Sequence, residues 1–252
     1  MEKCPLNDFF SPAQRARFLE AVAKRRSVRA YRMGPDMAQL SALHFAAARV
    51  CLPGVRIVLH DAEPELLFRR LPMVGGISGT NKYAAVIADD SVTPRAALHA
   101  GISGEAFVLE ATAMGLGTCW VASFRKNAVD IPLNPHEKVL AVTPLGVSNE
   151  VSSGRKRKKL TEICVGDPAS WPLWAYHAAE CVRQAPSAVN LQPWRLAYAG
   201  RTLMLMKGGV GGSALDLGIA LLHMSLGVGD KPHEIQWGEG KEIASLIAED
   251  EA

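Results

Sequence analysis

Two groups of polar and charged residues, one in each half of the chain, have the composition of a binding site. The first is residues 25–31, Arg-Arg-Ser-Val-Arg-Ala-Tyr. A guanidinium carries a planar set of donors that matches a phosphate, and a serine hydroxyl adds another donor. In an extended segment alternate side chains point the same way, so Arg25, Ser27 and Arg29 can line one site. These residue types predict an anion site, and the alternative is a solvated basic helix end favoured by the helix dipole.

The second group is residues 185–194, Ala-Pro-Ser-Ala-Val-Asn-Leu-Gln-Pro-Trp. Its two prolines stiffen the backbone, so that polar groups between them are held in place. Ser187 and Asn190 can both donate and accept hydrogen bonds. We expect Trp194 to pack in the core at the start of a strand. The segment therefore predicts a rigid polar binding loop, and the alternative is a capped turn with a buried tryptophan.

Helices and strands that would position these groups are visible in the hydrophobic pattern. Ser11 and Pro12 are suited to begin a helix, which runs into the arginines. A second, alanine-rich helix is expected over 37–50, and a mostly apolar helix over 101–114 ends at two glycines. Short apolar runs predict strands at 55–59, 84–88 and 138–145.

The pattern then restarts, which indicates an internal repeat. A helix is expected over 172–182, and its end resembles residues 46–50. Further on, residues 217–226 resemble residues 100–109 with the same Gly-to-Leu spacing. We therefore expect two related halves within one chain.

Composition excludes several classes of protein. A length of 252 residues suits one large or two small domains, and a net charge of +3 is too small to indicate nucleic-acid binding. The five cysteines are scattered without a Cys-x-x-Cys pair, so neither a zinc site nor a disulfide framework is expected. The sequence shows no signal peptide and no apolar stretch long enough for a membrane span. We expect a soluble cytoplasmic protein without a metal site.

Together the two motifs resemble those of the FMN-dependent nitroreductase family. The arginine motif directly follows the first helix, where that family carries its FMN-phosphate motif, and the Pro-Ser-x-x-Asn string matches almost residue for residue. The resemblance implies FMN as cofactor. It implies two sets of cofactor-binding residues, one at the phosphate and one at the ring edge and ribityl chain: Arg25, Arg26, Ser27 and Arg29, and Pro186, Ser187, Asn190 and Gln192.

Two further segments gain a role from this resemblance. The turn at 115–120 would lead to Val121, Ala122 and Ser123, where a main-chain amide would donate to flavin N5. Family members often have an acidic residue and a glycine there, and this chain has Ala-Ser instead. The basic run at 155–159 would close over the phosphate through Arg155 and Arg157, and the alternative is a solvated loop.

The resemblance also predicts a fused architecture. Residues 12–163 are similar to one nitroreductase subunit without its Pro-Ser-x-x-Asn loop, and residues 166–252 to a shortened second copy without the arginine motif. The arrangement resembles a subgroup with two such domains in tandem. The expected fold is α+β, an antiparallel-rich sheet flanked by helices in each repeat. The repeats would form a pseudo-dimer with one flavin site, as a monomer or a weak homo-oligomer.

The implied activity is that of an oxidoreductase with a ping-pong hydride mechanism. NADH or NADPH would reduce the flavin, and a small-molecule acceptor such as a nitroaromatic or quinone would then be reduced. Hydride transfer needs no protein acid or base, so no catalytic residue is assigned. The alternatives are a flavin-binding protein without turnover, and flavin fragmentation or reductive dehalogenation on the same fold. A glycine-rich segment at 208–214 loosely matches a dinucleotide-binding turn, but it lacks the surrounding βαβ unit, so a flexible turn is favoured.

Overall fold

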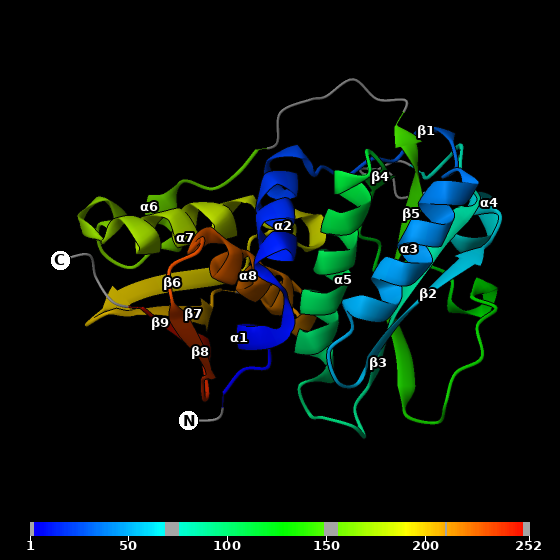
Figure 1. Cartoon of the computed structure of the whole chain (residues 1–252). Helices are drawn as coiled ribbons and strands as arrows, with labels where there is room; N and C mark the ends of the chain where they lie inside the picture. The colour runs from blue at the N-terminus through cyan, green and yellow to red at the C-terminus, as the bar shows by residue number, and fades with distance from the viewer. Residues whose placement is uncertain (1–2, 69–75, 149–155, 210, 249–252) are drawn as a thin grey trace. The chain divides into compact units, whose positions relative to one another are not determined.

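Two compact units, each with its own sheet, make up the computed structural model (Figure 1). We call Lys24–Arg155 the central unit, and Met1–Ala23 with Lys156–Ala252 the terminal unit. The structure describes residues 3–68, 76–148, 156–209 and 211–248.

The central unit contains an antiparallel sheet. Its strand order is β1-β5-β3-β2, and β4 also pairs with β5. The strands are β1 (Tyr31–Met33), β2 (Val55–Asp61), β3 (Lys82–Asp89), β4 (Gly117–Thr118) and β5 (Glu137–Ser148). The three predicted strands are confirmed, and each is a few residues longer than its apolar run.

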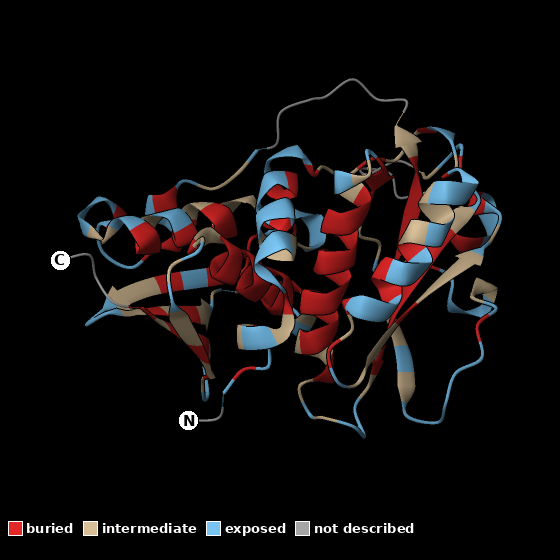
Figure 2. Ribbon diagram, viewed as in Figure 1, coloured by how far each residue is buried: buried red, intermediate tan, exposed pale blue. Residues whose placement is uncertain are grey.

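Helices α3 (Met37–Arg49) and α5 (Ala96–Ala113) pack together and against this sheet (Figure 1). α3 begins at a capping box in which Asp36 accepts from the Gln39 amide. α5 is buried along almost its whole length, as Figure 2 shows, which accounts for its mostly apolar sequence. Two short helical segments, α4 (Pro64–Leu67) and the 3-10 turn η1 (Lys126–Ala128), complete the described part of this unit.

The terminal unit contains a second antiparallel sheet, with strand order β6-β7-β9-β8. Its strands are β6 (Trp194–Ala199), β7 (Thr202–Lys207), β8 (His233–Trp237) and β9 (Glu242–Ala248). Its longer helices are α2 (Pro12–Lys24), α7 (Leu173–Gln184) and α8 (Ala214–Gly227). Shorter helical segments are α1 (Leu6–Phe9), α6 (Leu160–Ile163), η2 (Pro168–Ser170) and η3 (Ala188–Asn190).

The first long helix belongs to the terminal unit although it begins only twelve residues into the chain. Arg15 of α2 donates to the Ser225 hydroxyl and carbonyl of α8, at 2.9 and 2.6 Å. Lys24, the last residue of α2, begins the central unit.

The longer elements of the two units follow the same order along the chain. The central unit runs α3-β2-β3-α5-β4-β5, and the terminal unit runs α7-β6-β7-α8-β8-β9. In the central sheet β5 pairs with β3, and in the terminal sheet β9 pairs with β7. Each pairing contains a register shift. The predicted α+β class is confirmed. The predicted repeats, 12–163 and 166–252, are each continuous in sequence, whereas the terminal unit combines both ends of the chain. The bounds differ because α2 packs in the terminal unit. These boundaries stay a prediction.

No helix in the described residues is both long and apolar enough to cross a membrane. The same residues contain no cluster of three or more histidine, cysteine or acidic side chains that could hold a metal ion.

Candidate functional site

The arginine motif is an extended segment held between two neighbours within the central unit. Ser27 forms a parallel bridge with Thr118, and Ala30 forms one with Ser78. The Val28 amide donates to the Thr118 carbonyl at 2.8 Å, and the Ser78 amide donates to the Arg29 carbonyl at 3.0 Å. The backbone of the motif is therefore fixed on both sides.

Side chains of the motif differ in their access to solvent. Arg26, Ser27 and Arg29 are partly exposed, whereas Arg25 is only 2% exposed. The Arg25 Nε lies 3.6 Å from the Glu105 carboxylate. Burial lowers the pKa of Arg25, and the charge of Glu105 opposes that shift. Arg26, Ser27 and Arg29 are therefore accessible to an anion from solvent, and Arg25 is closed to solvent.

The segment predicted beside flavin N5 lies next to this motif. It continues from β4, the strand whose Thr118 pairs with Ser27. Val121 exchanges two backbone hydrogen bonds with Val142, each 2.9 Å long. The Val121 amide is therefore already engaged, whereas Ala122 and Ser123 are exposed. The amides of Ala122 and Ser123 lie outside this pairing, and the contact to N5 stays a prediction.

The Pro-Ser loop lies in the terminal unit, between α7 and β6. Its interior is built by hydrogen bonds: the Gln192 amide donates to the Ser187 hydroxyl at 2.8 Å, and the Ala188 amide donates to Asp216 at 2.9 Å. Pro186 and Gln192 are buried, and Asn190 is exposed. Trp194 is 1% exposed at the start of β6, as predicted. The loop is therefore rigid, with Asn190 at its surface.

The same loop has a strained backbone. Val189, Asn190 and Gln192 have φ of 43°, 58° and 47°. This left-handed region is sparsely populated by residues with a side chain, and a β-branched residue such as Val189 is a strong outlier there. Backbone strain of this kind is concentrated at binding sites, where the surrounding structure maintains it.

The basic run packs on the loop. Arg157 donates to the Asn190 side chain and, at 2.9 Å, to the Gln184 carbonyl. Asn190 in turn donates to the Lys156 carbonyl at 3.0 Å, and the Lys158 amide donates to Gln192 at 3.1 Å. Two predicted site residues, Arg157 and Asn190, thus touch. Arg155 lies outside the described residues.

Packing explains part of the glycine-rich segment that loosely matched a dinucleotide turn. A Cβ on Gly208 would lie 2.9 Å from the Trp194 backbone, and one on Gly212 would lie 2.9 Å from Pro193. These glycines allow close approach of the segment to the Pro-Ser loop.

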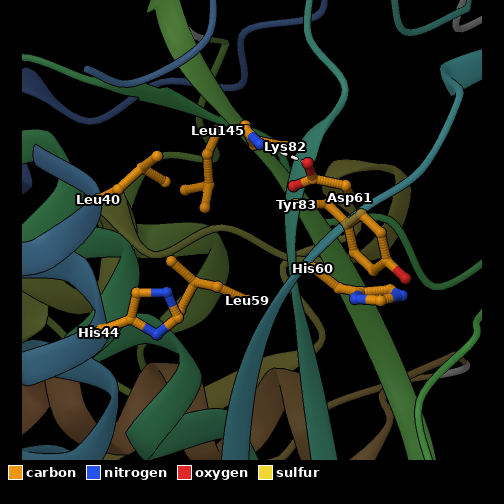
Figure 3. Close-up of a pocket in the computed structure, with 8 residues that line it drawn as sticks. All are labelled: Leu40, His44, Leu59, His60, Asp61, Lys82, Tyr83 and Leu145. Atoms are coloured by element: carbon orange, nitrogen blue, oxygen red, sulfur yellow. Dashed lines mark hydrogen bonds and ion pairs between the residues drawn. The ribbon is translucent and has the colours of Figure 1, made fainter. Parts of the chain in front are cut away.

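A small pocket in the central unit is separate from the predicted cofactor residues (Figure 3). Its volume is about 100 Å³. That is well below the several hundred Å³ of ordinary cofactor sites. Its lining comes from α3, β2, β3 and β5: Leu40, His44, Leu59, His60, Asp61, Lys82, Tyr83 and Leu145. In Figure 3 Lys82 faces Asp61, and the His60 ring lies beside Tyr83. We assign no cofactor to it.

Sequence inspection missed two residues that position the site. Glu105 faces Arg25 from the middle of α5, and Asp216 holds the Pro-Ser loop from the start of α8. The Ser-x-x-Asp pattern at Ser213 marks Asp216 as a helix-capping residue, but not as a loop contact. Nothing in the apolar sequence around Glu105 indicates its partner.

Relieving the strain at Val189 should stabilise the protein. Its side chain is 77% exposed, so little packing is lost on substitution. Asparagine tolerates the left-handed region, and Val189→Asn should raise the free energy of unfolding by roughly 1 kcal/mol in urea denaturation. The control is Val165→Asn at another exposed valine of the terminal unit, which has no positive φ. Equal effects of the two substitutions would mean that the Val189 backbone is not strained.

Comparison with known proteins agrees with this architecture. The family model described as "Putative TM nitroreductase" matches residues 17–228. A "putative nitroreductase" from Thermotoga maritima MSB8 is 25% identical, with a TM-score of 0.61 over 92% of this chain and 93% of that chain. A search of curated proteins found no match.

Two other solved structures have lower scores. A nitroreductase family protein from Streptococcus pneumoniae TIGR4 is 16% identical, with a TM-score of 0.49 over 60% of this chain and 100% of that one. An FMN-dependent nitroreductase from Clostridium difficile R20291 is 20% identical, with a TM-score of 0.42 over 54% and 90%. Since the family model spans most of the sequence, the chain belongs to the TM nitroreductase family and has a nitroreductase-like α+β fold.

Proposed function

We propose that this protein is an FMN-dependent NAD(P)H oxidoreductase that reduces nitroaromatics, quinones or similar acceptors. One observation carries the proposal. The bridge between Ser27 and Thr118 joins a set of partly exposed phosphate donors to the strand that leads to the exposed residues Ala122 and Ser123. A phosphate site and an amide donor site on connected backbone suit a ligand with a phosphate at one end and a polar ring at the other.

The residues fit the two ends of FMN. At the phosphate, Arg26, Ser27 and Arg29 would supply charge-assisted and hydroxyl hydrogen bonds. At the ring, the amide of Ala122 or Ser123 would donate to N5.

In the terminal unit, Asn190 keeps one amide hydrogen and one lone pair beyond its bonds to Lys156 and Arg157. Those groups can serve the ring edge or ribityl chain, with Ser187 and Gln192 beside them.

Bound FMN would supply the redox chemistry, accepting a hydride from NADH or NADPH and passing it to the acceptor. The protein's part is to bind the cofactor, fix the orientation of its ring and leave one face open to each substrate in turn. No side chain needs to act as acid or base in the hydride step. Because the two substrates use the open face of the flavin one after the other, we expect ping-pong kinetics.

We further propose one site per chain in a monomeric pseudo-dimer or weak homo-oligomer, because each motif occurs once. All five cysteines are free thiols, which fits a reducing compartment such as the cytoplasm.

An anaerobic titration tests the activity. The purified protein should be yellow, should bleach on addition of NADH or NADPH, and should regain its colour when a nitroaromatic or quinone is added. A yellow protein that neither nucleotide bleaches would be a flavin-binding protein without turnover. Consumption of the flavin itself would indicate flavin fragmentation.

A further inference from the structure

A fully buried carboxylate joins the two segments that the proposed function assigns to FMN. Glu105 lies in the middle of α5 with no exposed surface. One of its oxygens lies 3.6 Å from the Arg25 Nε, and the other accepts a hydrogen bond from the Trp120 indole at 2.7 Å. Arg25 immediately precedes Arg26 and Ser27, and Trp120 immediately precedes the Val121–Ser123 segment.

Neighbouring residues make room for this arrangement. A Cβ on Gly104 would overlap the far edge of the Trp120 ring, so the glycine lets the indole lie close against α5. In the same way a Cβ on Gly117 would lie 2.8 Å from the Val28 side chain, which is itself buried. The arginine motif and β4 are thus packed together beside the Ser27–Thr118 bridge.

The location of Glu105 argues for a positional role. Burying a carboxylate and a guanidinium is costly, and such a pair is no better for stability than apolar residues of similar size. What a buried pair can contribute is a defined geometry between the elements that carry the charges. Here those elements are the two segments that meet at the proposed site.

We propose that Glu105 is a positioning residue that holds the phosphate-binding and ring-binding segments in register. The inference rests on the proposed function. It assigns Arg25 an indirect role: its guanidinium would orient the motif through Glu105, while Arg26, Ser27 and Arg29 contact the phosphate. Glu105 itself would touch neither cofactor nor substrate.

Glu105→Gln tests the ionic half of this arrangement. Glutamine keeps an acceptor for Trp120 but removes the charge opposite Arg25. FMN affinity should fall by roughly tenfold or more, because a buried charge loses its partner and the adjacent phosphate donors shift. Riboflavin affinity should fall less, since riboflavin lacks the phosphate. The matched control is Glu110→Gln, at another buried glutamate on α5, which should leave both affinities unchanged.

Trp120→Phe tests the other half. Phenylalanine keeps an aromatic ring, but it lacks the donor to Glu105 and the far edge of the indole that lies against Gly104. This variant should weaken FMN and riboflavin binding alike and should shift the flavin absorption spectrum, because it perturbs the ring end.

Hydrogen exchange of the flavin-free protein provides a readout that does not depend on the proposed function. Glu105→Gln should speed exchange in peptides that cover both 26–30 and 119–123, and Glu110→Gln should not. If the wild-type protein binds no FMN, the proposed function fails. The exchange data still test whether Glu105 couples residues 26–30 to residues 119–123. Unchanged FMN-to-riboflavin selectivity and unchanged exchange in a folded Glu105→Gln variant would overturn the inference. If that variant does not fold, a Trp120→Phe variant without effect on spectrum or exchange would overturn it.

Discussion

Arg29→Ala should weaken FMN binding by roughly 1.5–3 kcal/mol, the usual loss for one hydrogen bond to a charged group. The Arg29 side chain is partly exposed, whereas its carbonyl is held by the Ser78 amide at 3.0 Å. The substitution therefore removes the guanidinium and leaves the backbone in place. Calorimetric titration of the flavin-free protein with FMN measures the effect.

Riboflavin distinguishes a phosphate contact from general damage. Because riboflavin lacks the phosphate, its affinity should change little in Arg29→Ala. Arg32→Ala is the matched protein control, since Arg32 is an exposed arginine three residues further along, on β1. Equal losses of FMN and riboflavin affinity would contradict the assigned role of Arg29.

Gly79→Ala should lower the free energy of unfolding by roughly 3 kcal/mol or more, the largest loss of stability that we predict for any substitution in this protein. Gly79 has a φ of 83°, and an added Cβ would overlap the Tyr31 carbonyl oxygen. The left-handed conformation alone costs a non-glycine residue roughly 1–2 kcal/mol. The overlap adds to this because the obstacle is backbone and cannot rotate away. The added Cβ would also push Ser78 away from Arg29 and Tyr31. The backbone hydrogen bonds that Ser78 makes with these two residues hold the arginine motif.

Gly115→Ala isolates the contribution of the overlap. Gly115 has a φ of 79°, almost the same as Gly79, but an added Cβ would meet no atom within 4 Å. Its substitution should cost only the conformational strain, roughly 1 kcal/mol. Urea unfolding of both variants gives the comparison, and equal losses would show that the Gly79–Tyr31 approach is looser than described.

Local features of this fold could be predicted from the sequence, because their causes are local. The start of α2 at Pro12 follows from capping residues, and strands β2, β3 and β5 follow from short apolar runs. The place of Trp194 follows in the same way from a large apolar residue at a strand start. The family resemblance supplied the roles of the motifs, which periodicity alone does not.

Features that depend on distant residues could not be predicted. The alternation of side chains in an extended segment predicts that Arg25 lines the same site as Ser27 and Arg29. In the structure the Arg25 guanidinium is instead buried beside Glu105 of α5. The sequence does not distinguish the Val121 amide from those of Ala122 and Ser123, whereas in the structure the Val121 amide is hydrogen-bonded to Val142. Likewise, the assignment of α2 to the terminal unit depends on Arg15 meeting Ser225, from the opposite end of the chain.

The flavin released from the purified, denatured protein tests the central claim most directly. Each chain carries one arginine motif and one Pro-Ser-x-x-Asn loop, and the proposal is one flavin per chain. Chromatographic identification and quantification should therefore give FMN at one equivalent per chain after saturation with the cofactor and removal of the excess. Two equivalents per chain, FAD in place of FMN, or no retained flavin would contradict the account.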